Sequence, residues 1–158
     1  MASTTFSGPV TSQNGFIGNL TGNVTGNVTG AVASTELTAA STLTAAQSGT
    51  VFFLNSATEF ATTLPAPAAG LTYTFIVKAA PSGANYTVVT ASSANIIKGQ
   101  AYPASGDAGD TGTADDTISF VSAQSVAGDM VTVISDGTSW FAKAFCAVAA
   151  GVTFTQAS

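Results

Sequence analysis

The chain has 158 residues, enough for one domain with a buried core, and we interpret it as a compact domain that carries an extended arm. Its three basic side chains are all lysines and stand against eight acidic ones, for a formal net charge of −5 at pH 7. Because duplex binding depends on several Lys or Arg contacts to phosphate, this balance argues against nucleic acid as a direct partner.

Charged residues make up 7% of the chain, far below the ~25% that is usual for soluble domains. Thr, Ser, Asn and Gln fill the polar positions instead, and Thr favours β-strands. The sequence contains no histidine, which removes the commonest general base and the commonest metal ligand. We therefore expect a non-enzymatic, all-β protein without a cofactor or a bound metal.

The first residues, Met1 to Thr5, have no basic region followed by an apolar run, so no secretory signal is expected. No stretch of the sequence reaches the ~18 to 20 apolar residues of a membrane span. We expect a protein that is made in the host cytoplasm and has no membrane partner. Cys146 is the only cysteine, which fits a reducing compartment, and we predict that it lies in the core.

A tetrad repeat, Gly-Asn-aliphatic-Thr, occurs three times within residues 16–32. Four is a multiple of the two-residue period of a strand, so an extended strand places all the aliphatic side chains on one face. A helix is disfavoured, because each Gly would cost ~1 kcal/mol relative to Ala. A disordered linker is the alternative. The strand interpretation predicts an oligomer interface made of Phe16, Leu20, Val24, Val28 and Val32.

Such a strand is not stable alone, since ordering the backbone costs ~1 to 2 kcal/mol per residue. Aliphatic residues that alternate with Gly suit a narrow symmetric axis, so we expect identical arms to associate. We assign residues 1–47 to this arm and a linker, and residues 48–158 to a β-domain. Within the first part, residues 36–47 fit both a short helix and a linker.

After residue 48 the sequence consists of short alternating runs separated by turn residues. We predict strands at residues 50–55, 72–80, 85–90, 117–122, 130–135, 139–145 and 152–155. Asp136-Gly137 is a strong hairpin signal between two of them. Short strands with Gly, Pro and Asp turns predict a sandwich, jelly roll or barrel, and we expect a β-sandwich or jelly-roll-like domain.

The stretch GDAGDTGTADD holds a cluster of carboxylates, which suits either a calcium site or an acid–base pair. Its spacing does not match an EF-hand, and a solvated acidic loop is the favoured interpretation. The cluster consists of Asp107, Asp110, Asp115 and Asp116.

Scattered aromatic residues either line a sugar-binding surface or pack in a core or an interface, and packing is the commoner role. The residues considered are Tyr73, Tyr86, Tyr102 and Trp140. Four asparagines satisfy N-x-[ST], but without a secretory signal we interpret them as by-products of the sequence pattern. These are Asn19, Asn23, Asn27 and Asn85.

Three stretches resemble a small β-domain that recurs in tailed-phage and prophage structural proteins. They are LTAAQSGTVFFLN, TTLPAPAAGLTYTFIV at residues 62–77, and GDMVTVISDGTSWFA at residues 128–142. The opening TTFSGPVTSQNGFIGNLTGNVTG is similar to the N-terminal region of marine and cyanobacterial phage virion proteins. This resemblance covers most of the chain and implies a trimeric, β-structured appendage or cement protein without catalytic residues.

From these observations we expect a structural protein of a bacteriophage virion. The leading hypothesis is a homotrimeric capsid decoration protein on the outer surface of the head, with the major capsid protein as its partner. The alternative is a short head or tail fibre, or an appendage that binds host glycans. An enzyme such as a polysaccharide depolymerase is the least favoured class.

Overall fold

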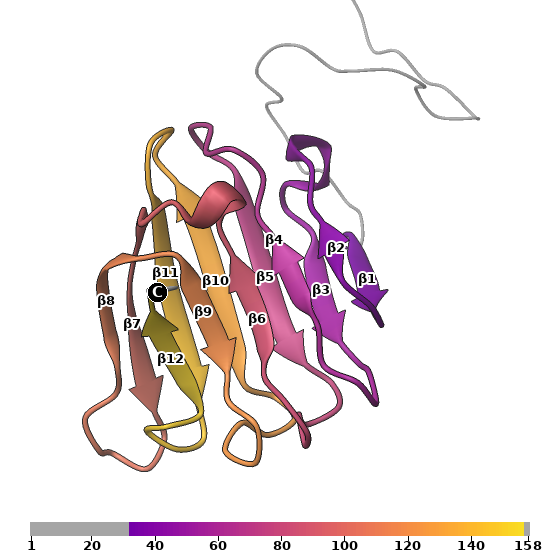
Figure 1. Cartoon of the computed structure of the whole chain (residues 1–158), viewed down its shortest axis with the longest axis vertical. Coiled ribbons are helices and arrows are strands. Elements are labelled where there is room, and N and C mark those ends of the chain that lie inside the picture. The colour runs from indigo at the N-terminus through magenta and orange to yellow at the C-terminus, as the bar shows by residue number, and fades with distance from the viewer. Residues whose placement is uncertain (1–31, 157–158) are drawn as a thin grey trace, which may run out of the picture. The chain divides into compact units, whose positions relative to one another are not determined.

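The computed structural model describes residues 32–156, and they form twelve strands and two short 3₁₀ helices (Figure 1). In chain order these are β1 (Ser34–Leu37), β2 (Ser41–Thr42), η1 (Ala45–Gln47), β3 (Val51–Leu54), β4 (Ala61–Thr63), β5 (Thr72–Val77), β6 (Tyr86–Val89), η2 (Ala91–Ser93), β7 (Ile97–Pro103), β8 (Thr111–Asp115), β9 (Thr117–Phe120), β10 (Met130–Ser135), β11 (Trp140–Cys146) and β12 (Val152–Thr155). Within the described range, no helix is long and apolar enough to cross a membrane.

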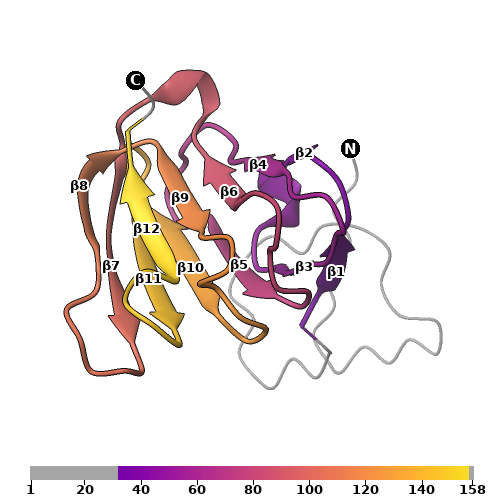
Figure 2. The same cartoon turned by 60° about the horizontal axis from the view of Figure 1, so that its bottom comes forward.

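The strands form two sheets that lie face to face around one core, as the turned view in Figure 2 shows. The seven-stranded sheet has the order β1-β3-β5-β10-β11-β7-β8, and the five-stranded sheet has the order β12-β9-β6-β4-β2. The predicted all-β class is confirmed. Both sheets contain parallel and antiparallel pairs, which distinguishes them from the antiparallel sheets of a jelly roll.

The first six strands alternate between the two sheets, so that the chain makes three successive coils. Strands β1, β3 and β5 are parallel neighbours in one sheet, and β2, β4 and β6 are parallel neighbours in the other. Like residues therefore stack from coil to coil: Leu54 lies between Leu37 and Val77, and Phe52 stacks on Phe75 with 5.6 Å between ring centroids. This is the packing principle of a β-solenoid, applied over three turns.

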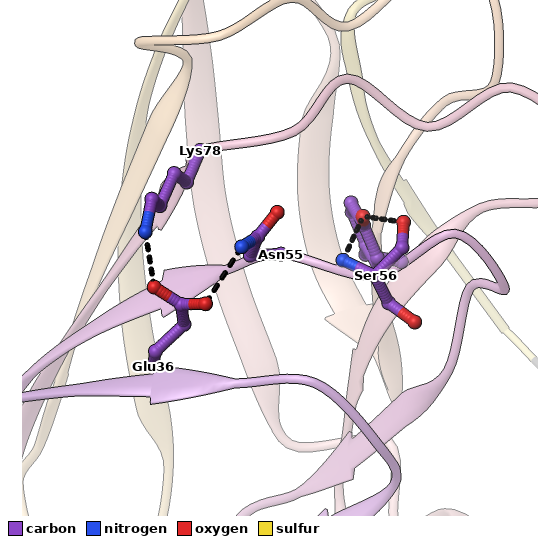
Figure 3. A network of polar contacts seen from close by, with 5 residues as sticks. Glu36, Asn55, Ser56 and Lys78 are labelled. Atoms are coloured by element: carbon purple, nitrogen blue, oxygen red, sulfur yellow. Dashed lines mark hydrogen bonds and ion pairs between the residues drawn. The ribbon is translucent and has the colours of Figure 1, made fainter.

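A polar clip holds the three coils together at one end of their strands (Figure 3). The carboxylate of Glu36 on β1 accepts hydrogen bonds from the Nδ2 of Asn55, which follows β3, and from the ammonium of Lys78, which follows β5. The hydroxyl of Tyr86 both donates to the carbonyl and accepts from the amide of Ser56. Side chains thus connect each coil to the next where the strands end.

The last six strands return across the sandwich mainly by antiparallel pairing. The predicted Asp136-Gly137 hairpin joins β10 to β11, and Gly137 adopts a φ of +105°. The Oδ1 of Asp136 accepts hydrogen bonds from the amides of Thr138 and Ser139, which lowers the pKa of this carboxyl. These bonds to the ionised form stabilise the turn that sets the β10–β11 register.

The core contains buried side chains from both sheets, and its largest members meet at the centre. Trp140 on β11 is fully buried and lies 5.7 Å from the ring of Tyr73 on β5. Tyr73 in turn donates its hydroxyl proton to the carbonyl of Thr44. The alternation of β5 turns Tyr73, Phe75 and Val77 inward, and all three are buried.

The expected boundary between residues 47 and 48 needs correction. Residues 34–47 are part of the two sheets, because β1 and β2 pair with β3 and β4, and the compact unit begins at Ala31. The segment predicted as a helix or linker instead contains the end of β1, the short strand β2 and one 3₁₀ turn. Its hydroxyl and alanine residues carry no apolar alternation that would have marked a strand.

Candidate functional site: the outer face of the seven-stranded sheet

The seven-stranded sheet turns every second side chain away from the core, and the strand registers line these side chains up in rows. One row runs across five adjacent strands and is apolar throughout, and we call it the apolar row. It consists of Phe53, Ile76, Met130, Phe145 and Tyr102. At its far end, on β1, it reaches Glu36.

The apolar row is most exposed where β11 meets β7. Phe145 is 51% exposed and Tyr102 is 45% exposed, and their rings stack with 5.7 Å between centroids. On the same face, Ile134 of β10 and Phe141 of β11 are 52% and 47% exposed and lie opposite each other across the β10–β11 pair. Large apolar side chains that gather on one face in this way mark a binding surface rather than scattered exposure.

All three basic side chains of the protein lie on this face as well. Lys78 forms an ion pair with Glu36 in the polar clip. Lys98 on β7 donates to the hydroxyl of Ser139, 3.3 Å away, and its ammonium lies 5.6 Å from the centroid of the Phe141 ring. Lys143 stands on β11 between the two exposed phenylalanines. In the part of the chain that the structure describes, neither Lys98 nor Lys143 forms an ion pair.

A shallow cleft of about 350 Å³ lies over β11, β7 and β8, and we call it the β7 cleft. Its side chains include two aromatic rings, both unpaired lysines, one amide and two hydroxyls. They are Lys98, Gln100, Tyr102, Thr111, Thr113, Phe141 and Lys143. The hydroxyl of Tyr102 donates to the Oε1 of Gln100 at 2.6 Å, which orients the amide.

Two glycines shape the floor of this cleft. A Cβ atom at Gly99 would lie 2.7 Å from the carbonyl oxygen of Ala142 and 2.8 Å from the ring of Phe154. At Gly112 it would lie 2.9 Å from Phe154, so both positions require glycine for close packing. The carboxylate of Asp110 accepts a hydrogen bond from the amide of Phe154 at 2.7 Å. These contacts pack β7 and β8 closely against β12, which fixes the positions of the outward side chains of β7 and β8.

The acidic cluster predicted from the sequence is only partly a loop. Strand β8 includes Asp115, while Asp116 is 2% exposed and accepts a hydrogen bond from the hydroxyl of Thr117. Asp110 bonds backbone amides on both of its oxygens, and Asp107 is exposed. In the range 32–156 no group of three or more His, Cys, Asp or Glu side chains is arranged to hold a metal ion. Asp110 and Asp116 thus form hydrogen bonds within the fold, Asp110 with backbone amides and Asp116 with a neighbouring hydroxyl.

The aromatic residues considered from the sequence divide into two groups. Tyr73, Tyr86 and Trp140 are at most 1% exposed and belong to the core, which confirms the packing interpretation for them. Tyr102 alone lies on the surface, beside two phenylalanines that the sequence interpretation did not single out. Phe141 and Phe145 fall in the alternating run of β11, and that pattern was compatible with either set of side chains pointing inward.

The other residues singled out from the sequence either have a structural role or lie outside the described residues. Cys146 is 5% exposed, as predicted for a core residue, and burial raises the pKa of its thiol. The side chain of Asn85 accepts a hydrogen bond from the amide of Ser122. In the predicted oligomer interface only Val32 is described, and it is 66% exposed. The other interface residues and three asparagines lie outside the described residues: Phe16, Leu20, Val24, Val28, Asn19, Asn23 and Asn27.

A buried carboxylate, Asp129, holds two turns together at the start of β10 and does not form a binding site. Asp129 is 4% exposed and accepts hydrogen bonds from the Ser125 hydroxyl, the Val126 amide and the Ala147 amide, at 2.9, 3.0 and 2.9 Å. It ties the turn before β10 to the turn after β11. With its acceptor positions occupied by protein donors, it is a structural residue.

Comparison of the chain with protein-family models, curated proteins and solved structures gave no match. The candidate site therefore rests on its own geometry.

Proposed function

We propose that this protein is a non-enzymatic structural component of a bacteriophage virion, a capsid decoration (cement) protein on the outer surface of the head. The observation that carries the proposal is the apolar row, which crosses five strands and has large side chains exposed at one end. Exposed apolar surface of this kind favours attachment to another protein. The partner in this proposal is the major capsid protein.

The two-sheet architecture supports a role as a rigid surface module. Its core side chains come from both sheets, and parallel coils are stacked in register. The resemblance of three stretches to tailed-phage structural proteins points the same way. The side chains of the β7 cleft are lysines, aromatic rings, hydroxyls and an amide, a set that suits binding of a ligand.

The proposal includes a homotrimer, whose arms associate through Phe16, Leu20, Val24, Val28 and Val32. A trimer offers several copies of a weak contact to the capsid at once, and multivalency strengthens attachment without new contacts. Native mass spectrometry at micromolar concentration tests this part, and a monomer would refute it. Val24→Asp should weaken the oligomer far more than Thr25→Asp, because only the first places a charge on the shared face.

The location is tested by reconstruction of the particle or by gold labelling of the protein on it. We expect density or label over the head, repeated at symmetric positions. Label confined to the tail with a bare head would refute the capsid assignment. The alternative, a short head or tail fibre or a host-glycan-binding appendage, would then take its place, and the aromatic and polar lining of the β7 cleft is the observation that favours it.

A further inference from the structure

We propose that the β7 cleft binds an acidic polysaccharide, with Phe141 and Tyr102 as stacking platforms and Lys98 and Lys143 as partners for its carboxylates. This inference deepens the glycan-binding alternative by naming the site and the ligand class. It rests on that alternative, because Tyr102 belongs both to the β7 cleft and to the apolar row that the decoration proposal places against the capsid.

The aromatic rings provide the apolar part of the site. Phe141 and Tyr102 are each nearly half exposed, although burying such rings is favourable and the core of this protein buries most of its aromatic side chains. Sugar rings present flat faces of C–H groups that stack on such platforms. Phe141 and Phe145 are four residues apart on β11, about 13 Å at ~3.3 Å per residue, so the aromatic positions span more than one sugar ring along the strand.

The two lysines of the cleft favour a negatively charged ligand. The chain has a net charge of −5, yet two of its three cations line this one cleft, and these are the two without an ion pair in the described range. The ammonium of Lys98 lies over one face of the Phe141 ring, 5.6 Å from its centroid, so the cation and the aromatic ring belong to one part of the cleft. A ligand that carries carboxylates on a sugar backbone complements both features, whereas a neutral sugar leaves the lysines unused.

The polar side chains between the aromatic positions fit a sugar better than an acidic protein surface. The register places Lys143, Gln100 and Thr111 in one row across β11, β7 and β8. The Oε1 of Gln100 is occupied by the Tyr102 hydroxyl, which leaves its amide N–H groups as donors, and Thr111 and Thr113 add hydroxyls. Donors and hydroxyls in the centre of the patch match hydroxyl-rich ligands, while protein interfaces place apolar groups at their centre.

The test is a binding titration of the full-length protein with polygalacturonate, a polymer of uronic acid, and with a neutral glucan of similar length. We expect binding of the polyuronate that falls as salt is raised, because exposed charge pairs are screened. Binding of the glucan should be weaker by about tenfold or more. Failure to bind polygalacturonate, or equal affinity for the two polymers, would overturn the proposal.

Substitutions test whether the ligand binds in the β7 cleft, and the same face of the seven-stranded sheet offers matched control positions. Replacing both Lys98 and Lys143 by Gln should weaken polyuronate binding by about tenfold, and Phe141→Ala by about fivefold or more. Lys78→Gln and Phe53→Ala, which lie outside the cleft, should bind like the wild type. Controls that weaken binding as much as the cleft variants do would overturn the assignment.

An acidic protein partner is the competing occupant, and polyglutamate serves as its probe. Binding of polyglutamate as tight as that of polygalacturonate, with Phe141→Ala binding both as the wild type does, would overturn the proposal in favour of a purely electrostatic protein contact. Near-ultraviolet circular dichroism verifies that each variant is folded, and all five substituted positions lie on the outer face of the seven-stranded sheet. Label on the phage head together with no polyuronate binding would refute this inference and leave the decoration proposal standing.

Discussion

The N-terminal and C-terminal halves of the domain differ in how their strands are arranged and in how much apolar surface they expose. The N-terminal half, β1 to β6, is a stack of parallel coils, and between Ser34 and Val89 of the described chain no large apolar side chain is classed as exposed. The C-terminal half, β7 to β12, contains six of the seven exposed large apolar residues and both unpaired lysines. The first half builds the scaffold and supplies Phe53 and Ile76 to the apolar row, and the second half carries the exposed end of that row and the β7 cleft.

The difference follows from how each half is stabilised. Stacked coils repeat the same inward residues, and their outward positions include small hydroxyl residues such as Ser34, Thr72 and Thr74. The returning strands complete the core with alternating inward residues such as Ala142, Ala144 and Cys146, so their outward positions are free for large side chains. Binding residues are thus placed on rigid strands rather than on loops, which favours a preorganised site.

The largest effect is expected where the two halves meet. Trp140→Ala removes a fully buried ring that packs against Tyr73, and should destabilise the domain by about 3 to 5 kcal/mol. Urea unfolding followed by circular dichroism measures the loss. Phe141→Ala, its exposed neighbour, is the control and should change stability by less than about 1 kcal/mol. Two separate unfolding transitions in the wild type would contradict the view that the halves share one core.

A smaller loss is expected within the C-terminal half alone. Asp129→Ala leaves the buried hydroxyl of Ser125 and the partly buried amides of Val126 and Ala147 without their acceptor, at a cost of about 2 to 3 kcal/mol. Asp107→Ala, at an exposed carboxylate, should be neutral. Hydrogen exchange should show the loosened amides near β10 and β12 while the β3 and β5 amides keep their protection. Equal loss of protection in both halves would show that this carboxylate supports the whole core.

The N-terminal half has its own acid-sensitive contact. Glu59, before β4, accepts hydrogen bonds from the amides of Ser82 and Gly83, and these lower its pKa from 4.5 to about 2. Because the folded pKa is depressed, the contribution is complete above about pH 4.5 and is lost as the pH falls toward 2. Glu59→Gln should lower the melting temperature at pH 6 and flatten its decline between pH 4.5 and 2. Thermal scans across this range that match the wild type would exclude the contact as a source of acid sensitivity.

The smallest effect is expected from removal of residues 1–31. The core cluster of the described domain begins at Leu37, so the truncated protein should keep its unfolding free energy within about 0.5 kcal/mol. Chemical unfolding of both proteins at matched concentrations measures the difference. A larger loss would show that the preceding segment covers the free edge of β1 and is part of the scaffold.

Much of the strand content was predictable from local pattern. The alternation of residues 72–80 indicated a strand, and the Asp136-Gly137 turn indicated an antiparallel pair, both as observed. Strands β1, β2, β4, β7 and β8 were missed, and of these Ala61–Thr63 and Thr111–Asp115 contain no apolar alternation. For the candidate site, Tyr102 was named but Phe141 and Phe145 were not. An alternating run has two faces, and the composition of β11 did not decide between them.

By itself the sequence determined the all-β class, several strands and one hairpin, since these depend on side-chain period and turn chemistry along a few residues. Only the tertiary structure decided that β1, β3 and β5 are parallel neighbours, because a two-residue period shows which face is buried and carries no information on which strand lies next to it. The parallel pairing of β7 with β11 brings Lys98 and Phe141, 43 positions apart in the chain, into one cleft. A binding surface that crosses strands is a property of register, which the folded sheet sets.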